Sequence, residues 1–352
     1  MNDFLPEDTI LIVDDEPANI KTLASTLGQH YRVLAATSGE QALDIIFERS
    51  CELDLILLDV LMPGLTGYDV NARVRSYPET ANIPIIFITA RTDPDEEARG
   101  LDMGAVDYIG KPFHPVTVQA RVKTQIELKK HKEYLDDMVA ARTQELIQAR
   151  EDIVLRLAKA AETRDNETGM HIIRLSKLCE MLARAIGMKR TMARTLATAS
   201  LMHDVGKIGI PDNILLKPGR HTEEERAIMQ THTTLGGEIL ADGDNDLLIM
   251  AREIALTHHE RWDGTGYPCG LKGEEIPLEG RITSVCDVFD ALTSVRPYKE
   301  AWSVEKAAAF LRENSGSMFE PRLVDLFLAN LDQVLDIISA YQDEPERILQ
   351  PN

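Results

Sequence analysis

A stretch without glycine or proline, from Val116 to about Ala161, constrains the fold of this sequence more than any other feature. It keeps a helical pattern over a length that exceeds a typical helix of a globular protein. A chain of 352 residues is also too long for one compact core. The sequence therefore predicts two domains and a long helical connector, residues 116–161, between them.

A heptad repeat can be placed on this connector, although the repeat is imperfect. One seam position falls on Lys132, Val139, Leu146, Ile153 and Ala160. The other falls on Leu128, Leu135, Arg142, Ala149 and Arg156. Mostly apolar residues at these positions favour a coiled coil, so one interpretation is a homodimer formed through this helix. The other interpretation is a single amphipathic helix that packs on its own domain.

Short apolar runs alternate with helical patterns between residue 9 and about residue 112. The runs expected to form strands are 9–13, 32–36, 53–58 and 83–88, with a shorter one near 106–109. Amphipathic segments such as 17–28 and 39–49 lie between them. This alternation predicts a parallel sheet covered by helices on both faces. The reactive groups of such a sheet gather at the carboxyl ends of its strands.

The sequence beyond residue 150 has no strand pattern of comparable strength. Glycine and proline mark loops around 208–220, 263–280 and 296–298. We therefore expect a mostly α-helical second domain over residues 150–345, which overlaps the end of the connector.

Composition and charge exclude several classes of function. The net charge of −20 argues against a surface that grips DNA or RNA, and against an anionic membrane as partner. The N-terminus carries no secretory signal, and no apolar run approaches the roughly 20 residues of a membrane span. The four cysteines are scattered, as expected for unpaired thiols in a reducing compartment. We expect a cytoplasmic protein.

Acidic residues follow two of the expected strands in the first domain. Asp14 and Asp15 come directly after the first strand, and Asp59 follows the third. Three carboxylates at one sheet edge repel one another, so they need a cation, and Mg²⁺ prefers oxygen ligands. A carboxylate beside Mg²⁺ can act as a nucleophile toward a phosphoryl donor. Thr89 and Lys111, at the ends of the last two strands, add a hydroxyl and a cation for phosphoryl oxygens.

The Asp14-Asp15 pair, Asp59 in LLDVLMPGLTG, Thr89 in ITA, Tyr108 and Lys111-Pro112 occur in this order. With these features, residues 8–125 resemble a response-regulator receiver domain. The resemblance implies a flavodoxin-like fold with five parallel strands, and a sensor histidine kinase as phosphodonor. It makes Asp59 the phosphoacceptor. The resemblance implies that Asp15, Asp59 and the Leu61 carbonyl bind Mg²⁺, with help from Asp14. It also implies that Thr89 and Tyr108 form a switch pair and that Lys111 contacts the phosphoryl group.

A second set of polar residues lies in the helical half of the chain. Six of the nine histidines fall between residues 171 and 259. Candidate ligands with nitrogen or oxygen donors are Glu167, His171, His203, Asp204, His232, His258, His259 and Asp287. Glu167 and His171 are four residues apart, so on a helix both project from one face. On a helix, the vicinal pairs His203-Asp204 and His258-His259 would diverge by about 100°, which suits a carboxylate that bridges two ions. This donor set, without thiolates, indicates two or three ions of the Fe, Mn, Ni or Zn type, although the ligand types alone do not select among these metals. We expect Fe or Mn, with Ni or Zn as alternatives.

Three runs in this half are specific: HDVGKIGIPDNILLKPG, HHERWDGTGYPCG and DVFDALTSVRPYK. With them, residues from about 150 to 330 resemble the HD-GYP subfamily of HD-domain phosphohydrolases, whose fold is all-α. The resemblance implies hydrolysis of cyclic di-GMP to pGpG, and in some members on to GMP. It places the eight candidate ligands at metal-binding positions, with Asp204 bridging and Glu167 supporting a third ion. The implied substrate contacts are Lys207, Tyr267, Arg296 and Lys299.

The chemistry of the residues points the same way. Hydrolysis of a phosphodiester needs a nucleophile at neutral pH and relief of charge on the phosphate oxygens, and paired metal ions supply both. Lys207, Arg296 and Lys299 would add charge-assisted hydrogen bonds to the phosphate. The sequence thus predicts a phosphorylation-controlled cyclic di-GMP phosphodiesterase. Two alternatives stay open: hydrolysis of 3′,3′-cyclic GMP-AMP, and a catalytically silent cyclic-dinucleotide sensor or docking module.

Overall fold

The structure is a computed structural model that describes residues 8–90, 102–165, 169–294 and 301–342. The chain divides into two compact units, Met1–Gln144 and Glu145–Asn352. Three residues with predicted roles, Glu167, Arg296 and Lys299, lie outside the described residues.

The first unit is built on a five-stranded parallel sheet with the order β2-β1-β3-β4-β5. The strands are β1 (Thr9–Val13), β2 (Arg32–Ala36), β3 (Leu55–Asp59), β4 (Ile85–Thr89) and β5 (Asp107–Gly110). Every residue of β1, β3 and β4 is buried, as the continuous apolar runs predict. The predicted parallel α/β fold is therefore confirmed.

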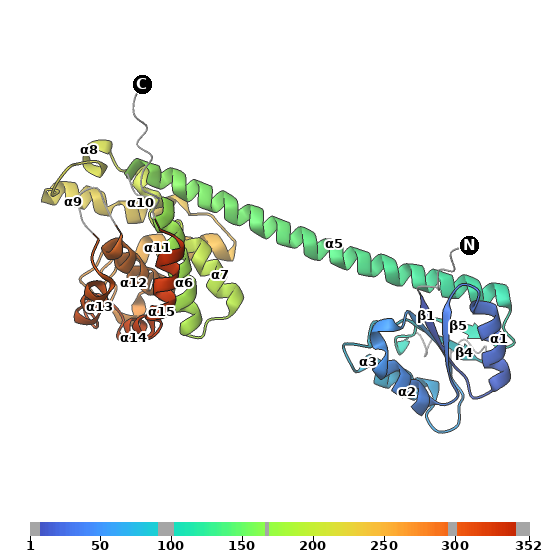
Figure 1. The fold of residues 1–352 in the computed structure, drawn as a ribbon. Coiled ribbons are helices and arrows are strands. Elements are labelled where there is room, and N and C mark those ends of the chain that lie inside the picture. The colour runs from blue at the N-terminus through green and yellow to red at the C-terminus, as the bar shows by residue number, and fades with distance from the viewer. Residues whose placement is uncertain (1–7, 91–101, 166–168, 295–300, 343–352) are drawn as a thin grey trace. The chain divides into compact units, whose positions relative to one another are not determined.

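Helices cover both faces of this sheet (Figure 1). Leu23 and Leu27 of α1 (Pro17–Leu27) pack on one face together with Val118 and Val122 of α5 (Pro115–Glu162). The other face is covered by α2 (Gly39–Glu48) and α3 (Gly67–Arg75). Short 3-10 turns such as Ser50–Glu52 connect the elements. Because β1 and β3 are central, their carboxyl ends lie side by side, where ligands bind in such sheets.

Helix α5 agrees closely with the predicted connector, residues 116–161. It is 48 residues long and continues from the first unit into the second. Its first turns bury Val118, Val122 and Ile126 against the sheet. Its last turns bury Val154 and Ala158 in the core of the second unit.

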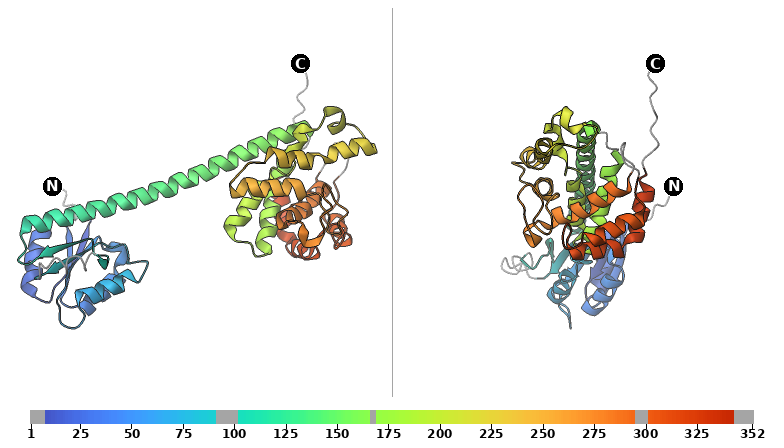
Figure 2. Two further views of the ribbon diagram at one scale, coloured as in Figure 1. Left: turned by 180° about the vertical axis from the view of Figure 1, so that it is seen from behind. Right: turned by 90° about the vertical axis from the view of Figure 1, so that its left-hand side faces the viewer.

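The second unit is all helical within its described residues, apart from an isolated bridge between Ser315 and Phe319 (Figures 1 and 2). After α5, its helices are α6 (Gly169–Ala185), α7 (Arg190–Ser200), α8 (Asp212–Leu215), α9 (Glu223–Gln230), α10 (His232–Ile239), α11 (Asp246–Thr257), α12 (Leu278–Thr293), α13 (Val304–Glu313), α14 (Pro321–Ala329) and α15 (Leu331–Ala340). Short 3-10 segments cover Thr163–Asp165, Val205–Gly209 and Gly273–Glu275. One core joins residues of α6, α7, α11, α12, α13, α14 and α15. No helix among the described residues is both long and apolar enough to cross a bilayer.

Candidate phosphoacceptor pocket and metal centre

The first site lies at the carboxyl ends of β1 and β3. Oxygen atoms of Asp14, Asp15 and Asp59 all lie within 4.8 Å of one another. Asp14 and Asp59 are almost fully buried. Two buried carboxylates this close require a positive charge beside them. The structure thus brings the three acidic residues of the sequence prediction together.

Lys111, which follows β5, supplies a positive charge to this pocket. Its Nζ lies 2.6 Å from Asp59 Oδ2 and 2.9 Å from Asp14 Oδ2. Burial raises the pKa of Asp59 above its ordinary value, and Lys111 offsets this only in part. The Leu61 N–H donates to Asp59 Oδ1 over 3.3 Å, which places the Leu61 backbone beside the same carboxylate.

The predicted switch residues lie on the two strands next to this pocket. Thr89 is the last residue of β4 and is buried. Tyr108 lies on β5 and packs against the core that α2 and α3 cover. The guanidinium of Arg121, on α5, lies 5.6 Å from the centre of the Tyr108 ring. Arg121 also forms an ion pair with Asp107 of β5. Strand β5 is therefore in direct contact with α5.

The second site gathers histidines from four segments of the helical unit. His171 lies on α6, His203 follows α7, His232 begins α10, and His258 directly follows α11. All four side chains are buried. The prediction of a helix at His203 and Asp204 is wrong, because α7 ends at Ser200 and both residues lie in a turn. The carboxylate and the imidazole therefore face each other across 3.2 Å instead of diverging.

Backbone carbonyls orient three of these imidazoles through Nδ1. Nδ1 of His203 contacts the Ser200 carbonyl at 3.0 Å, that of His232 the Met229 carbonyl at 2.8 Å, and that of His258 the Ile254 carbonyl at 2.9 Å. A carbonyl only accepts, so each Nδ1 carries a proton, and each Nε2 is the nitrogen left to face a metal ion. All three Nε2 atoms are buried and, among the described residues, make no hydrogen bond of acceptable geometry. This is the arrangement of metal-binding histidines.

Asp204 occupies the centre of these imidazoles. Its Oδ1 lies 3.2 Å from His232 Nε2 and 3.5 Å from His258 Nε2, while its Oδ2 faces His203 Nε2. Its two oxygens thus face different ligands, as a bridging carboxylate requires. Donor atoms of Asp204, His232, His258 and His259 all lie within 4.8 Å of one another. The residues therefore fit a metal ion.

The electrostatics of the pocket favour a cation. Burial opposes ionisation of Asp204, but Lys207, whose Nζ is 2.9 Å from Oδ2, and His203 hold its pKa well below the usual value. Burial alone would lower the pKa of His203, yet the charge of Asp204 raises it to about 10. Burial also holds the pKa of His259 well below its usual value, so its imidazole is neutral and can bind a metal.

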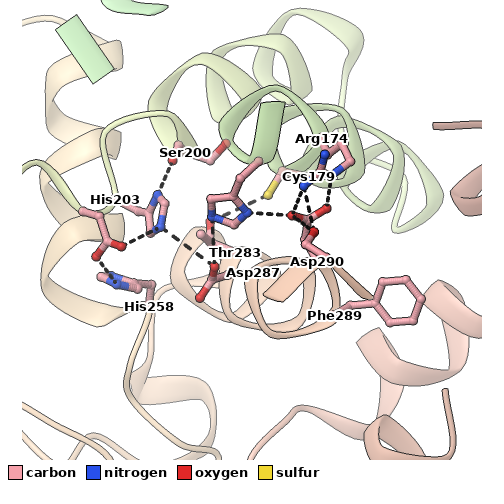
Figure 3. A network of polar contacts seen from close by, with 12 residues as sticks. Arg174, Cys179, Ser200, His203, His258, Thr283, Asp287, Phe289 and Asp290 are labelled. Carbon is pink, nitrogen blue, oxygen red and sulfur yellow. Dashed lines mark hydrogen bonds and ion pairs between the residues drawn. The ribbon is translucent and has the colours of Figure 1, made fainter. Parts of the chain in front are cut away.

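Two residues to which the sequence analysis gave no role, Asp290 in the run DVFDALTSVRPYK and Arg174, hold His171. Asp290 of α12 is fully buried, and its Oδ2 lies 2.6 Å from His171 Nδ1 (Figure 3). Arg174 donates to both oxygens of Asp290, over 2.7 and 3.1 Å. On the other side of the ring, His171 Nε2 lies 3.5 Å from Oδ1 of the predicted ligand Asp287, which is 3.9 Å from His203 Nε2. A carboxylate behind a metal-binding imidazole fixes its orientation and makes it a stronger ligand.

The loop after the His258-His259 pair forms one wall of the site. The ring of Tyr267 stacks on His259, with centroids 4.8 Å apart. Glu260, another buried residue that was not predicted, accepts hydrogen bonds from the N–H groups of Cys269, Gly270 and Leu271. Since these residues follow Tyr267 closely, Glu260 fixes the loop that carries the aromatic ring.

A further residue that was not predicted is Glu162, at the end of α5. Its carboxylate and donor atoms of His171 and His203 all lie within 4.8 Å of one another. No motif in the sequence singles it out. Glu162 is four residues after Ala158, so a helical periodicity places both on one face of the helix. The sequence offers no other indication that Glu162 is buried.

Two family models match the chain. A model described as the response regulator receiver domain matches residues 10–123, and a model described as the HD domain matches residues 133–323. The second match covers more than half of the chain.

Several curated proteins are similar to this chain. The chain is 41% identical over 361 residues to a probable cyclic di-GMP phosphodiesterase of Vibrio cholerae, covering 97% of this chain and 81% of that protein. It is 40% identical over 303 residues to the cyclic di-GMP phosphodiesterase response regulator RpfG of Xanthomonas campestris pv. campestris, covering 83% and 80%. A third relative, 3'3'-cGAMP-specific phosphodiesterase 2 of Vibrio cholerae, is 45% identical over 199 residues, covering 56% of this chain and 38% of that protein.

Proposed function

This chain belongs to the response regulators that combine a receiver domain with an HD domain. From this premise we propose that it is a metal-dependent phosphodiesterase of cyclic di-GMP, controlled through Asp59. The proposed domain limits are residues 8–125 for the receiver, 116–161 for the connector and 150–345 for the HD domain.

The orientation of the imidazoles around Asp204 carries this proposal. Three buried Nε2 atoms and Asp204 Oδ1 lack hydrogen-bond partners among the described residues, although each comes within 4 Å of another member of the group. Leaving several buried polar atoms without partners costs roughly 1–3 kcal/mol for each. A metal ion removes this cost because it accepts the lone pairs that these atoms direct toward one another.

The proposed ligands divide into two groups around Asp204. His232, His258 and His259 lie on one side with Oδ1. His203, His171 and Asp287 lie on the other. Transition-metal ions held in this way supply an activated water nucleophile and offset charge on the phosphate oxygens. We propose Fe or Mn as the native metal, with Glu167 as ligand of a third ion.

The other residues of the site would bind and orient the substrate. The ammonium of Lys207 lies 2.9 Å from Asp204 and is well placed to donate to a phosphate oxygen that approaches this carboxylate. Tyr267 presents an aromatic ring beside His259, against which a guanine base can stack. Arg296 and Lys299 are proposed as further phosphate contacts.

Cyclic di-GMP is the favoured substrate because the two relatives described above that match 97% and 83% of this chain bear that activity in their names. The relative named for 3'3'-cGAMP matches 56% of this chain, but at slightly higher identity. The base specificity of this pocket is therefore the second proposal to test. We propose linear pGpG as the product, with GMP as a further product.

The receiver pocket supports regulation by phosphorylation. We propose that a sensor histidine kinase supplies the phosphoryl group to Asp59, with Mg²⁺ held by Asp15, Asp59 and the Leu61 carbonyl. Asp14 would assist, Lys111 would contact the phosphoryl oxygens, and Thr89 and Tyr108 would respond to them. We also propose that α5 pairs with α5 of a second copy.

One experiment tests the enzymatic proposal. Protein purified without oxygen is analysed for bound metal and then assayed on cyclic di-GMP and 3′,3′-cyclic GMP-AMP. We expect at least two ions per chain and faster turnover of cyclic di-GMP. The Asp204→Ala and His203→Ala variants should lose metal and hydrolysis while keeping the helical circular dichroism of the parent. Binding of cyclic di-GMP without turnover by metal-loaded protein would support the silent sensor instead, and full turnover by Asp204→Ala would exclude a bridging role for Asp204.

A further inference from the structure

A buried glutamate at the end of α5 faces the metal centre. Glu162 is the last residue of α5, and its side chain is almost fully buried. Its carboxylate and donor atoms of His171 and His203 all lie within 4.8 Å of one another. We propose that Glu162 is a ligand of the ion that His171 and His203 bind, so that the connector helix itself contributes to the metal centre. This inference rests on the metal-dependent function proposed above.

The donor set that includes Glu162 suits a divalent transition metal. His171 and His203 offer nitrogen, and Asp287 Oδ1 lies 3.5 and 3.9 Å from their Nε2 atoms. Glu162 completes a set of two nitrogens and two oxygens, which is common for Fe, Mn and Zn. Its charge matters as well. Two divalent ions carry more positive charge than Asp204 and Asp287 together offset, and a further buried carboxylate lowers this excess.

The end of α5 is held firmly enough to position a ligand. On the N-terminal side of Glu162, the side chains of Val154, Ala158 and Ala161 are buried. Glu151 accepts two hydrogen bonds from Arg194 of α7, over 2.8 and 2.7 Å. This pairing ties α5 to the helix that leads into His203.

The chain just beyond Glu162 is also tied to the site. Arg164 donates to the carbonyls of Ile208 and Ile210 and forms an ion pair with Asp212 over 2.6 Å. These residues directly follow Lys207, which contacts Asp204. Both flanks of Glu162 are thus anchored to segments that carry other residues of the centre, so its carboxylate is held close to its position in the structure.

A different explanation makes Glu162 a structural counter-charge. Its negative charge contributes to the raised pKa of His203, although less than the charges of Asp204 and Asp287 do. If this were its only role, removal of the charge would weaken metal binding only through long-range electrostatics, the shorter Glu162→Asp would bind metal like the parent, and the set of ligands around the ion would not change. The two explanations therefore differ in a measurement that does not involve catalysis.

The test compares the full-length parent with Glu162→Gln, which preserves shape and removes the charge, and with Glu162→Asp, which keeps the charge on a shorter side chain. Metal content after anaerobic loading with Mn²⁺ and the affinity for Mn²⁺ are measured for each. We expect Glu162→Gln to bind one ion at least about tenfold more weakly, since the loss even of a residue that only supports a metal ligand typically costs about 10- to 100-fold in affinity. The remaining ion should be unaffected, and Glu162→Asp should fall between the two.

A matched control is Glu151→Gln, which removes the same charge from the same helix at a residue that binds Arg194 and not the centre. It should retain the metal affinity of the parent, because a glutamine can still accept from Arg194 and the buried Val154, Ala158 and Ala161 still hold the end of the helix. The visible spectrum of Co²⁺-loaded protein, which reports the ligands of the ion, should change in Glu162→Gln and not in Glu151→Gln.

The outcomes separate the two proposals. Unchanged Mn²⁺ affinity and an unchanged Co²⁺ spectrum in Glu162→Gln would overturn the role of Glu162. This role would also be overturned if Glu162→Gln and Glu151→Gln weaken metal binding equally, because the loss would then come from the helix end and not from the carboxylate. A parent protein that binds no transition metal would instead refute the proposed function.

Discussion

At the scale of single residues, the ends of helices determine which nitrogen of each histidine is available to a metal. Ser200 ends α7, Met229 lies in the last turn of α9, and Ile254 lies in the last turn of α11. A carbonyl oxygen has two lone pairs, so each of these three can accept from a side chain in addition to the backbone N–H that it already binds. Each of these three accepts from an Nδ1, and the fold thereby prepares three imidazoles as ligands before any metal binds.

The Asp290–His171 contact leads to a prediction. In Asp290→Asn, the buried Arg174 loses its charged partner and His171 loses the carboxylate that orients it. We expect the affinity for one metal ion to fall about 10- to 100-fold. We also expect the free energy of unfolding to fall by about 3–5 kcal/mol, because the buried guanidinium of Arg174 loses its ionised partner, although hydrogen bonds such as those to Ser294 and the Tyr341 carbonyl remain. Metal titration and urea denaturation measure the two effects.

The exposed Asp325→Asn on α14 serves as the control and should change neither quantity. Parent-like metal affinity in Asp290→Asn would show that the backbone alone positions His171.

Sequence motifs identify the ligands that have a distinctive side chain within a specific run, and miss the residues that support them. His203, Asp204, His232 and His258 are brought together as the motif predicts. Asp290 and Glu162 act through contacts between elements far apart in the chain, such as the 119-residue separation of His171 and Asp290. Glu260 acts over a shorter range, on backbone N–H groups 9 to 11 residues further along. Short-range spacing carries no information about such contacts, and carboxylates are common on helix surfaces.

At the scale of elements, the hydrophobic pattern predicts the strands well, because a strand buried on both faces of a parallel sheet is a continuous apolar run. The predicted strands 9–13 and 32–36 have the observed bounds. Strands predicted at 53–58 and 83–88 are observed at Leu55–Asp59 and Ile85–Thr89. The shift arises because polar residues at the carboxyl end, Asp59 and Thr89, still pair in the sheet, although the apolar run has ended. A hydrophobic pattern leaves Asp59 and Thr89 out of the strands, and these are residues of the candidate phosphoacceptor pocket.

The 3-10 segment Val205–Gly209 packs closely against α10 at Gly206. A Cβ on Gly206 would lie 1.8 Å from the His232 carbonyl oxygen and 2.4 Å from the Gly236 nitrogen. The Gly206→Ala substitution must therefore push apart the segments that carry Asp204 and His232. We expect a loss of stability of about 1–3 kcal/mol, as for overpacked cores, together with weaker metal binding.

Thermal unfolding and metal titration test this expectation. Gly219→Ala provides a comparison, since a Cβ at that position meets no atom within 4 Å, although the positive φ of Gly219 makes some loss of stability expected there too. A Gly206→Ala protein that binds metal as the parent does would show that the contact at Gly206 can relax without moving the ligands.

Helix α5 presents an apolar face without a partner among the described residues. Leu128, Leu135, Val139, Leu146 and Ile153 are more than half exposed. They occupy the seam positions of the heptad, whereas Val154 and Ala158, on a different face, pack into the second unit. A helix whose middle turns are exposed on all sides gains little stability by itself in water. A second copy of α5 would cover this face.

Substitution of Leu135 and Leu146 by Lys tests the pairing of α5. Each leucine that is no longer buried in a seam costs about 1.5–3 kcal/mol, which corresponds to about tenfold or more in dimer affinity. Because both residues are exposed in the single chain, the fold of each unit should be preserved. Analytical ultracentrifugation gives the dissociation constant, and circular dichroism gives the fold. Gln144→Lys, on the face opposite the seam, should leave the dimer intact, and a monomeric parent would refute the pairing.

At the scale of the whole molecule, one continuous helix links the two chemical sites. The receiver pocket contains Lys111, which follows β5, and β5 contacts α5 through the interactions of Asp107 and Tyr108 with Arg121. The other end of the same helix carries Glu162 beside the metal ligands. A change at Asp59 can therefore reach the metal centre through the ion pair with Lys111 and then along the continuous backbone of α5. The heptad seam is interrupted by Lys132, Arg142 and Arg156, which weakens any single register and favours two alternative states of the helix.

We predict that a phosphoryl mimic at Asp59 changes the phosphodiesterase rate and the dimer affinity together. Beryllofluoride placed on Asp59 would draw Lys111 away from Asp14, because the added charge and acceptor oxygens compete for the ammonium. A shift of β5 would then reach α5 through Arg121. Beryllofluoride can shift the equilibrium between two states of the protein only as far as its affinities for those states differ. The changes in phosphodiesterase rate and in dimer affinity must therefore be explained by the same difference in binding energy.

Asp59→Ala should abolish both responses while keeping the basal rate. Arg121→Ala should weaken the coupling although the mimic still binds. If beryllofluoride is bound at Asp59 and neither the rate nor the dimer affinity of the parent changes, α5 does not transmit the signal.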